Sequence, residues 1–181
     1  VKRMNYIMNK KEVCIIGAGP VGCYTAMELA KKGFNVEVFE EHSEIGMPVA
    51  CTGLVTESIK NIMQIKKEFL VNEIKNAEIF CGNKSVKIKL NEYVLDRCKF
   101  DNHLAECAKD NGVKIFTGHR FVGVDKNEIL IKPINRRLRF NENSKEGNTE
   151  RTAEKNEDKE TLKIKTKHLI GADGPSSLVG K

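Results

Sequence analysis

A glycine-rich turn between two short apolar runs constrains this chain more than any other feature. The apolar run at 13–16 leads directly into Gly17-Ala18-Gly19-Pro20-Val21-Gly22, and an amphipathic stretch and a second apolar run at 36–39 follow. This order predicts a strand, a tight turn, a helix and a second strand. Glu40 stands directly after the second strand, so an acid is expected at its carboxyl end.

Each part of this pattern suits the binding of a dinucleotide. Gly17 permits the tight turn, Gly19 lets the backbone approach a pyrophosphate, and Gly22 lets the helix pack close to the sheet. The amino end of the helix then offers free N–H groups and a positive dipole end to the phosphates. Glu40, 18 residues after Gly22, lies where a carboxylate can accept both hydroxyls of the adenosine ribose. A carboxylate there argues against a 2′-phosphate.

The glycine pattern alone is also compatible with an ordinary strand-to-helix turn. The flanking apolar runs and the acid at the end of the second strand favour the dinucleotide interpretation. The predicted helix supports it, because its small and apolar residues Cys23, Ala26, Met27 and Ala30 share one face.

Size and composition limit the remaining choices. The 181 residues suffice for one domain, and 40% hydrophobic with 31% charged residues indicates a globular protein. No apolar stretch approaches the roughly 20 residues that span a bilayer. Residues 1–12 form a predicted N-terminal extension without the apolar segment of a secretory signal.

Charge and cysteine usage point to a cytoplasmic protein. The net charge of +6 is spread along the chain rather than gathered in a basic stripe with aromatics, so no nucleic-acid partner is expected. It is compatible with weak attraction to an anionic membrane surface. Six cysteines without a C-x-x-C pair indicate a reducing compartment and no structural metal.

The rest of the chain alternates short strand and helix patterns. The elements expected after Glu40 are a loop at 42–53, a helix at about 56–67 burying Ile59, Ile62 and Met63, strands at 77–81, 85–90 and 93–95, a helix at 100–111, a strand at 113–116, a strand pair at 121–125 and 128–132, and a strand at 161–170. Leu95, the second helix and Val113 suggest a βαβ unit. Residues 135–160 are almost purely polar and are expected to form a charged flexible insertion.

Three further motifs accompany the glycine turn: R-x-x-F-D-x-x-L from Arg97, G-A-D-G-x-x-S from Gly171, and P-V-x-C-x-G from Pro48. Together they resemble the FAD-dependent oxidoreductases of the p-hydroxybenzoate hydroxylase fold. Within these the chain is most similar to the geranylgeranyl reductase family, including the archaeal digeranylgeranylglycerophospholipid reductases. The resemblance implies an α/β fold, a Rossmann-like FAD-binding domain over 13–181 with a small β element. The implied reaction is saturation of C=C bonds in the geranylgeranyl chains of isoprenoid ether lipids.

The resemblance also implies roles for single residues. Those implied to bind FAD are Gly17, Ala18, Gly19 and Gly22 at the pyrophosphate, Glu40 at the ribose, Cys51, Thr52 and Gly53 near the flavin, Arg97 at phosphate or ribose oxygens, the backbone of Val122 at the adenine, and Asp173 and Gly174 from the last strand. Cys51 is also the one candidate for a catalytic role.

These roles have plainer alternatives. Arg97 can be a solvated arginine before a helix, Asp173 with Gly174 an ordinary turn, Cys51 a small packing residue and Val122 a core residue. The four histidines, His42, His103, His119 and His168, are expected to be surface or structural residues without a catalytic role.

Members of the resembled family continue well beyond the G-A-D-G motif, so the chain is expected to be the N-terminal portion of a larger flavoprotein. The implied partners are an isoprenoid lipid, an electron donor (ferredoxin, a deazaflavin or NADPH), peripheral contact with a membrane surface, and a second chain that supplies the missing part. Two alternatives remain: a flavin monooxygenase of the aromatic-hydroxylase type, and a non-catalytic FAD- or nucleotide-binding subunit of a split enzyme.

Overall fold

The computed structural model describes residues 11–134, 160–175 and 177–180. Its elements are β1 (Lys11–Ile16), α1 (Pro20–Lys31), β2 (Val36–Phe39), β3 (Leu54–Thr56), the 3-10 helix η1 (Glu57–Asn61), β4 (Leu70–Cys81), β5 (Lys84–Leu95), α2 (Arg97–Asp110), β6 (Lys114–Phe116), β7 (His119–Asp125), β8 (Glu128–Pro133) and β9 (Leu162–Gly171). The first strand begins at Lys11, inside the predicted extension. The predicted insertion lies outside the described residues except for Glu160.

The larger sheet has six strands in the order β6-β2-β1-β9-β8-β7. Strands β6, β2, β1 and β9 run parallel, whereas β8 and β7 continue the sheet as an antiparallel meander. The carboxyl ends of β1 and β2 therefore lie side by side, with Ile16 opposite Phe39. The predicted order of strand, turn, helix and strand is confirmed.

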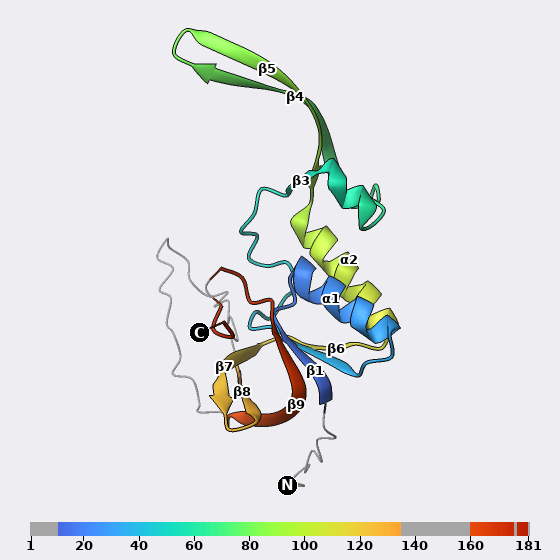
Figure 1. Cartoon of the computed structure of the whole chain (residues 1–181), viewed down its shortest axis with the longest axis vertical. Helices are drawn as coiled ribbons and strands as arrows, with labels where there is room; N and C mark the ends of the chain where they lie inside the picture. The colour runs from blue at the N-terminus through green and yellow to red at the C-terminus, as the bar shows by residue number, and fades with distance from the viewer. Residues whose placement is uncertain (1–10, 135–159, 176, 181) are drawn as a thin grey trace, which may run out of the picture.

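The sheet has an apolar cluster on each of its two faces, because alternate residues of β1 point to opposite sides. Val13 and Ile15 pack with α1 and α2, and the fully buried Cys23 and Ala26 of α1 belong to the same cluster. On the other face β7, β8 and β9 contribute most of a second cluster, made of Cys14, Ile16, Phe39, Phe121, Ile129, Ile131 and Ile164. Figure 1 shows α1 and α2 together on one side of β1 and β6, and β7 and β8 at the end of the sheet away from both helices.

The second sheet is small, with the strand order β3-β5-β4. Strands β4 and β5 form a hairpin that extends far from the helices and the larger sheet (Figure 1). Three short strands were predicted over this region, at 77–81, 85–90 and 93–95. The number is wrong, because β5 runs unbroken through the last two and β4 begins seven residues before the first.

Two further predictions are wrong. Residues 56–67 do not form a long helix, since only η1 is helical and Ile62 is 59% exposed. The physical reason lies just beyond: Phe69 is buried against Phe100, with ring centroids 5.3 Å apart, and this contact commits the chain to β4. Leu95 and Val113 do not belong to one βαβ unit, because β5 lies in the small sheet and β6 pairs with β2.

Candidate functional site

The three glycines of the first turn have different surroundings. Gly17 has φ +100°, its N–H donates to the Phe39 carbonyl at 2.8 Å, and an added Cβ would lie 2.4 Å from the Ala172 carbonyl oxygen. An added Cβ on Gly22 would lie 2.0 Å from the Gly17 carbonyl oxygen. A Cβ on Gly19 would meet no protein atom within 4 Å. Gly17 and Gly22 are therefore required for packing, whereas Gly19 borders open space.

The amino end of α1 is suited to an anion. Pro20 occupies the first turn and carries no N–H, and the Cys23 N–H donates to the Gly19 carbonyl at 3.0 Å. Val21 and Gly22 supply the remaining N–H groups of the first turn, which have no partner within a helix. No acidic residue stands in that turn to compete with a phosphate for the positive end of the dipole.

Glu40 closes the turn from the end of β2. Its Oε2 accepts from the Ala18 N–H at 2.8 Å, and its Oε1 accepts from the His42 N–H at 2.9 Å and contacts His42 Nδ1 at 2.6 Å. The carboxylate is thus held directly beside the glycine turn, where the ribose of a bound dinucleotide is expected. Sequence reasoning assigned no role to His42, and no motif marks it.

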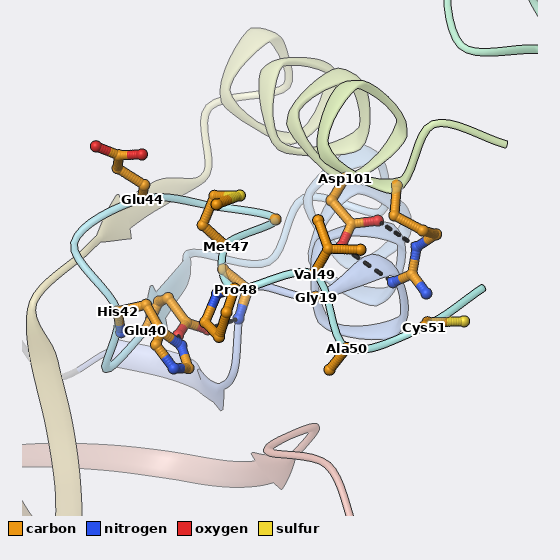
Figure 2. A pocket seen from close by; sticks show the side chains of 13 residues that line it. Gly19, Glu40, His42, Glu44, Met47, Pro48, Val49, Ala50, Cys51 and Asp101 are labelled. Carbon is orange, nitrogen blue, oxygen red and sulfur yellow. Dashed lines mark hydrogen bonds and ion pairs between the residues drawn. The ribbon is translucent and has the colours of Figure 1, made fainter. Parts of the chain in front are cut away.

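A cavity of about 290 Å³ opens between this turn and the loop that follows β2 (Figure 2). Its walls come from the turn before α1, from residues after β2, and from the first turns of α2. The lining residues are Ala18, Gly19, Glu40, His42, Glu44, Gly46, Met47, Pro48, Val49, Ala50, Cys51, Arg97 and Asp101. The fold thus brings Ala18, Gly19, Glu40, Cys51 and Arg97 to one cavity, although they come from distant parts of the sequence.

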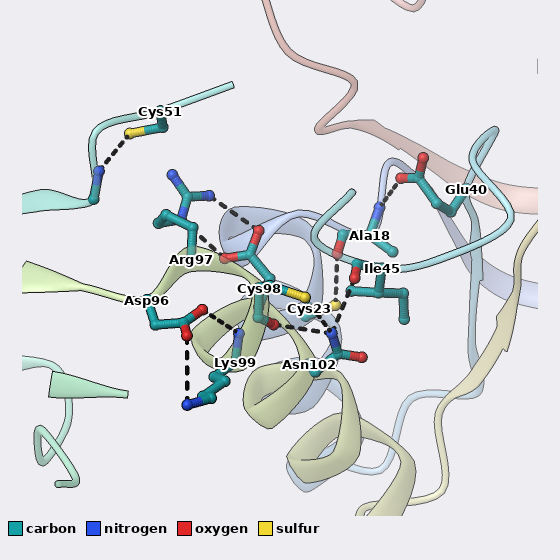
Figure 3. A network of polar contacts seen from close by, with 12 residues as sticks. Ala18, Cys23, Glu40, Ile45, Cys51, Asp96, Arg97, Cys98, Lys99 and Asn102 are labelled. Atoms are coloured by element: carbon teal, nitrogen blue, oxygen red, sulfur yellow. Dashed lines mark hydrogen bonds and ion pairs between the residues drawn. The ribbon is translucent and has the colours of Figure 1, made fainter. Parts of the chain in front are cut away.

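Arg97 is held in place by Asp101, one helical turn later on α2. Its Nε donates to Asp101 Oδ1 and its Nη2 to Oδ2, each at 3.0 Å, and the Asp101 side chain is only 7% exposed (Figure 3). The hydrogen bonds that Arg97 donates to Asp101 raise the pKa of Arg97, so the guanidinium stays charged. Burial raises the pKa of Asp101, and the guanidinium opposes that shift.

Asp101 was missed as a site residue, although the i, i+4 spacing with Arg97 was visible in the sequence. The pair occupies one edge of the guanidinium fork. The other N–H groups of Arg97 remain for the cavity, where they suit phosphate or ribose oxygens.

Cys51 is an exposed thiol at the rim of the cavity. The Gly53 N–H donates to its sulfur at 3.5 Å, and this contact, together with the Arg97 side chain, lowers the pKa of Cys51. The buried Cys23 contrasts with it, since burial raises the pKa of that thiol to about 12. Cys51 is therefore not a packing residue, and its surroundings make its thiol a stronger acid than an ordinary cysteine.

Other predicted site residues lie outside this cavity. Thr52 is exposed, and Gly53, with φ +76°, is pressed against the Leu95 carbonyl, which an added Cβ would approach to 2.1 Å. Asp173 and Gly174 follow β9 next to the glycine turn, but Asp173 Oδ2 accepts from the Leu178 N–H at 2.8 Å. Burial alone would raise the pKa of Asp173, but its contacts with Ser177 and Leu178 outweigh burial and lower it.

Val122 is 44% exposed and so is not a core residue. It is the extra residue of a bulge, because Phe121 pairs with Ile131 and Gly123 with Leu130. A bulged residue has no place in the hydrogen-bonded ladder, so its backbone groups suit an outside partner. The contact of this backbone with an adenine ring stays a prediction.

None of the helices in the described part of the chain is long and apolar enough to cross a membrane. Within the same residues, no cluster of three or more His, Cys, Asp or Glu side chains is arranged to hold a metal ion.

Comparison with known proteins gives relatives over nearly the whole chain. This chain is 31% identical over 178 residues to digeranylgeranylglycerophospholipid reductase 1 of Methanococcoides burtonii. The match covers 94% of this chain and 39% of that protein. It is 32% identical to the digeranylgeranylglycerophospholipid reductase of Thermoplasma volcanium, of which it covers 42%. The chain thus spans about two fifths of these reductases. An uncharacterized protein from Methanosarcina barkeri is 28% identical, and there the match covers 86% of the relative.

A solved structure with a similar fold is that of a geranylgeranyl bacteriochlorophyll reductase-like protein from Thermoplasma acidophilum. The TM-score is 0.73 at 26% identity, over 92% of this chain and 40% of that one. The flavin-dependent brominase Bmp2 matches with a TM-score of 0.60 at 16% identity, which shows a shared fold alone. A family model described as FAD binding domain matches residues 10–181. The chain therefore belongs to the FAD binding domain family, which confirms both the predicted fold class and the predicted cofactor.

Proposed function

We propose that this chain is the FAD-binding part of a reductase that saturates C=C bonds in the geranylgeranyl chains of isoprenoid ether lipids. The observation that carries the proposal is the cavity in which Gly19, Glu40, Cys51 and Arg97 meet. A plain dinucleotide site needs only the turn and the acid, whereas here a cysteine loop and a clamped arginine extend it. The similarity to named digeranylgeranylglycerophospholipid reductases over 94% of the chain supports the same reaction.

The residues divide the work of binding. The open space at Gly19 and the first N–H groups of α1 accommodate the diphosphate, and Glu40 accepts from the adenosine ribose. Arg97, fixed by Asp101, places its remaining N–H groups toward phosphate or ribose oxygens. The bulged backbone at Val122 borders the adenine. These groups orient the cofactor before any substrate binds.

When bound, reduced FAD supplies the hydride that adds to one carbon of the double bond. An unactivated alkene develops no oxyanion, so the protein's contribution is placement and exclusion of water. The second carbon needs a proton, and we assign its delivery to Cys51 Sγ, which lies at the cavity. The thiol loses that proton and regains one from solvent, to which it is exposed.

The competing hypothesis is a flavin monooxygenase. The fold alone does not decide between them, since it is shared with a flavin-dependent brominase. The two differ in their use of oxygen. The test incubates the FAD-loaded protein together with the remainder of the M. burtonii reductase 1, which this chain does not span. The mixture is kept without oxygen and receives a digeranylgeranyl glycerophospholipid and, in turn, reduced ferredoxin, a reduced deazaflavin or NADPH. Mass spectrometry then counts the hydrogens added, and saturation predicts two per double bond.

Cys51→Ala is the matched variant for this assay, and Cys107→Ala, a cysteine on the far end of α2, is its control. We expect loss of turnover with retained FAD binding for the first and no change for the second. An oxygenated product that forms only in air would contradict the proposed reductase and support a monooxygenase.

We further propose that residues 13–181 act with additional polypeptide. The chain spans about two fifths of the reductase relatives, so the surface for the lipid and the electron donor would come from outside these residues. A non-catalytic FAD-binding subunit differs in one result: with the additional polypeptide present, its Cys51→Ala variant would support saturation as well as the wild-type chain does. A cytoplasmic location at a membrane surface would give access to the lipid, and vesicle flotation tests it.

A further inference from the structure

A second cavity, of about 240 Å³, lies between α1, α2 and the segment that follows η1. None of the described residues lines both this cavity and the one at the glycine turn, here called the FAD cavity. Four side chains on its wall carry a sulfur or an imidazole nitrogen, and they come from all three parts of the chain. They are Met27 of α1, Met63 after η1, and His103 and Cys107 of α2. The proposed binding of FAD gives none of the four a role.

Cys107 and His103 form a preset pair of metal donors. They lie one helical turn apart on α2, and Cys107 Sγ is 3.6 Å from His103 Nε2. A tetrahedral ion with a thiolate bond of about 2.3 Å and an imidazole bond of about 2.0–2.1 Å holds these two atoms about 3.6 Å apart. The imidazole ring is held in place, since it packs on the buried Phe69 ring with centroids 5.4 Å apart. An ion can therefore enter between the two side chains without movement of the helix.

Two methionines add soft donors to this pair. Met27 and Met63 are both partly buried, and both pack against the apolar cluster that includes α1 and α2. A thioether is a weak hydrogen-bond acceptor and a soft metal ligand. Methionines often serve only to fill gaps in a core, but here both border open volume beside a thiol and an imidazole. The two thioethers raise the number of donors on the cavity wall from two to four.

The charged residues of the cavity favour a monovalent ion over a divalent one. Glu28, the carboxylate on the wall, is bonded to Lys31, with Oε1 2.7 Å from Nζ. Lys66 adds a second ammonium group. Repulsion between these ammonium groups and a bound ion is proportional to the charge of the ion, so a divalent ion is penalised more. A monovalent ion on the Cys107 thiolate forms a neutral unit instead.

We propose that this cavity is a Cu⁺ site. Soft thiolate and thioether donors select Cu⁺, whereas Zn²⁺ sites are usually completed by Cys, His or carboxylate ligands. Binding breaks the S–H bond of Cys107 and forms a sulfur–copper bond, and the proton leaves to solvent. Copper remains Cu⁺, so no electron is transferred. The site takes no part in the flavin reaction.

The test titrates the full chain with Cu⁺, without oxygen, in competition with a colorimetric Cu⁺ chelator. It uses the Cys51→Ala chain, so that the acidic thiol at the FAD cavity takes no ion. We expect one Cu⁺ to be retained per chain, and X-ray absorption should show both sulfur and nitrogen around the copper. Loss of a partner outside the ligand shell already weakens metal sites roughly 10- to 100-fold, so Cys107→Ser, which removes a ligand, should weaken binding at least that much.

Two further variants separate the site from general thiol binding. Met27→Leu keeps the apolar volume and removes a soft donor, so it should weaken Cu⁺ binding and lower the sulfur count around the copper. Cys81→Ser, which changes an exposed cysteine at the end of β4, is the control and should retain Cu⁺ as the parent does. FAD titration verifies folding of each variant, because the two cavities have separate walls.

Three results would overturn the proposal: a chain that yields all Cu⁺ to the chelator, a Cys107→Ser chain that binds as tightly as its parent, or a Met27→Leu chain with unchanged affinity and sulfur count. Tighter binding of Zn²⁺ than of Cu⁺ would overturn it too. Because retention of copper needs neither flavin nor lipid, failure of this site leaves the proposed reductase untouched, and failure of the reductase leaves the site untouched.

Discussion

The glycines of the first turn separate the stability of the fold from the binding of its cofactor. The backbone of Gly19 has φ −70° and ψ −178°, a region open to alanine, and an added Cβ meets nothing within 4 Å. Gly19→Ala should therefore leave the fold intact, or stabilise it by about 0.4–1 kcal/mol because the unfolded chain loses freedom. For a chain of this size the melting temperature would rise by roughly 1–4 °C.

The same methyl group would occupy space that a diphosphate needs. Loss of one hydrogen bond to a charged oxygen costs about 1.5–3 kcal/mol. Gly19→Ala should thus weaken FAD binding by roughly 10- to 100-fold. Titration calorimetry gives the dissociation constant, and a thermal melt of the protein without FAD gives the stability.

Gly22→Ala should lower the stability of the fold, which Gly19→Ala leaves unchanged or raises. Its Cβ would lie 2.0 Å from a backbone oxygen, which cannot rotate away, so a cost near the upper overpacking value of about 3 kcal/mol is expected. The higher helix propensity of alanine offsets roughly 1 kcal/mol. The net loss of about 2 kcal/mol lowers the melting temperature by roughly 4–8 °C.

Gly33→Ala is the control for this pair. Gly33 has φ +87° and no atom within 4 Å of an added Cβ, so alanine strains the backbone away from the site. That variant should lose stability and keep its FAD affinity. An unchanged dissociation constant for Gly19→Ala in a stable protein would refute the placement of the diphosphate at this turn.

Three further results are expected. Glu40→Gln should weaken FAD binding by roughly tenfold, measured by fluorescence titration, because a neutral amide accepts more weakly from a ribose hydroxyl. Iodoacetamide should alkylate Cys51 at a lower pH than an ordinary thiol, because its pKa is lowered, whereas Cys23 should stay unmodified; peptide mass spectrometry follows both. Asp101→Asn should destabilise the protein by about 1.5–3 kcal/mol, measured by urea unfolding, since it removes a charged partner from Arg97. It should also lower the pH at which Cys51 reacts, because it removes a negative charge that raises the pKa of Cys51 and leaves Arg97 free to stabilise the thiolate. Equal reactivity of the two cysteines, or an Asp101→Asn variant as stable as the wild type, would contradict these assignments.

The glycine turn and Glu40 could be predicted because their roles depend on short-range geometry. A tight turn, a helix amino end and an acid at the next strand end are set within about 25 residues of sequence. The turn also had to accept a close neighbour from far along the chain, since Ala172 lies against Gly17. Only the G-A-D-G motif gave a sign of that contact.

The hairpin could not be predicted from local propensity. Asn72 and Asn76 are poor strand formers, and β4 contains both because pairing with β5 supplies its hydrogen bonds. The expected helix at 56–67 failed for a similar reason, since burial of Phe69 outweighs the helical spacing of its apolar residues. Asp101 and His42 were missed because each acts on another site residue, Arg97 or Glu40.

The central claim is that one FAD lies across the cavity between the glycine turn and the cysteine loop. The most direct measurement is a titration of the protein with FAD, followed by amide hydrogen exchange of the FAD-bound and FAD-free forms. We predict one FAD per chain and slowed exchange at residues 17–23 and 46–53. The absence of FAD binding, or protection confined to other parts of the chain, would contradict the account.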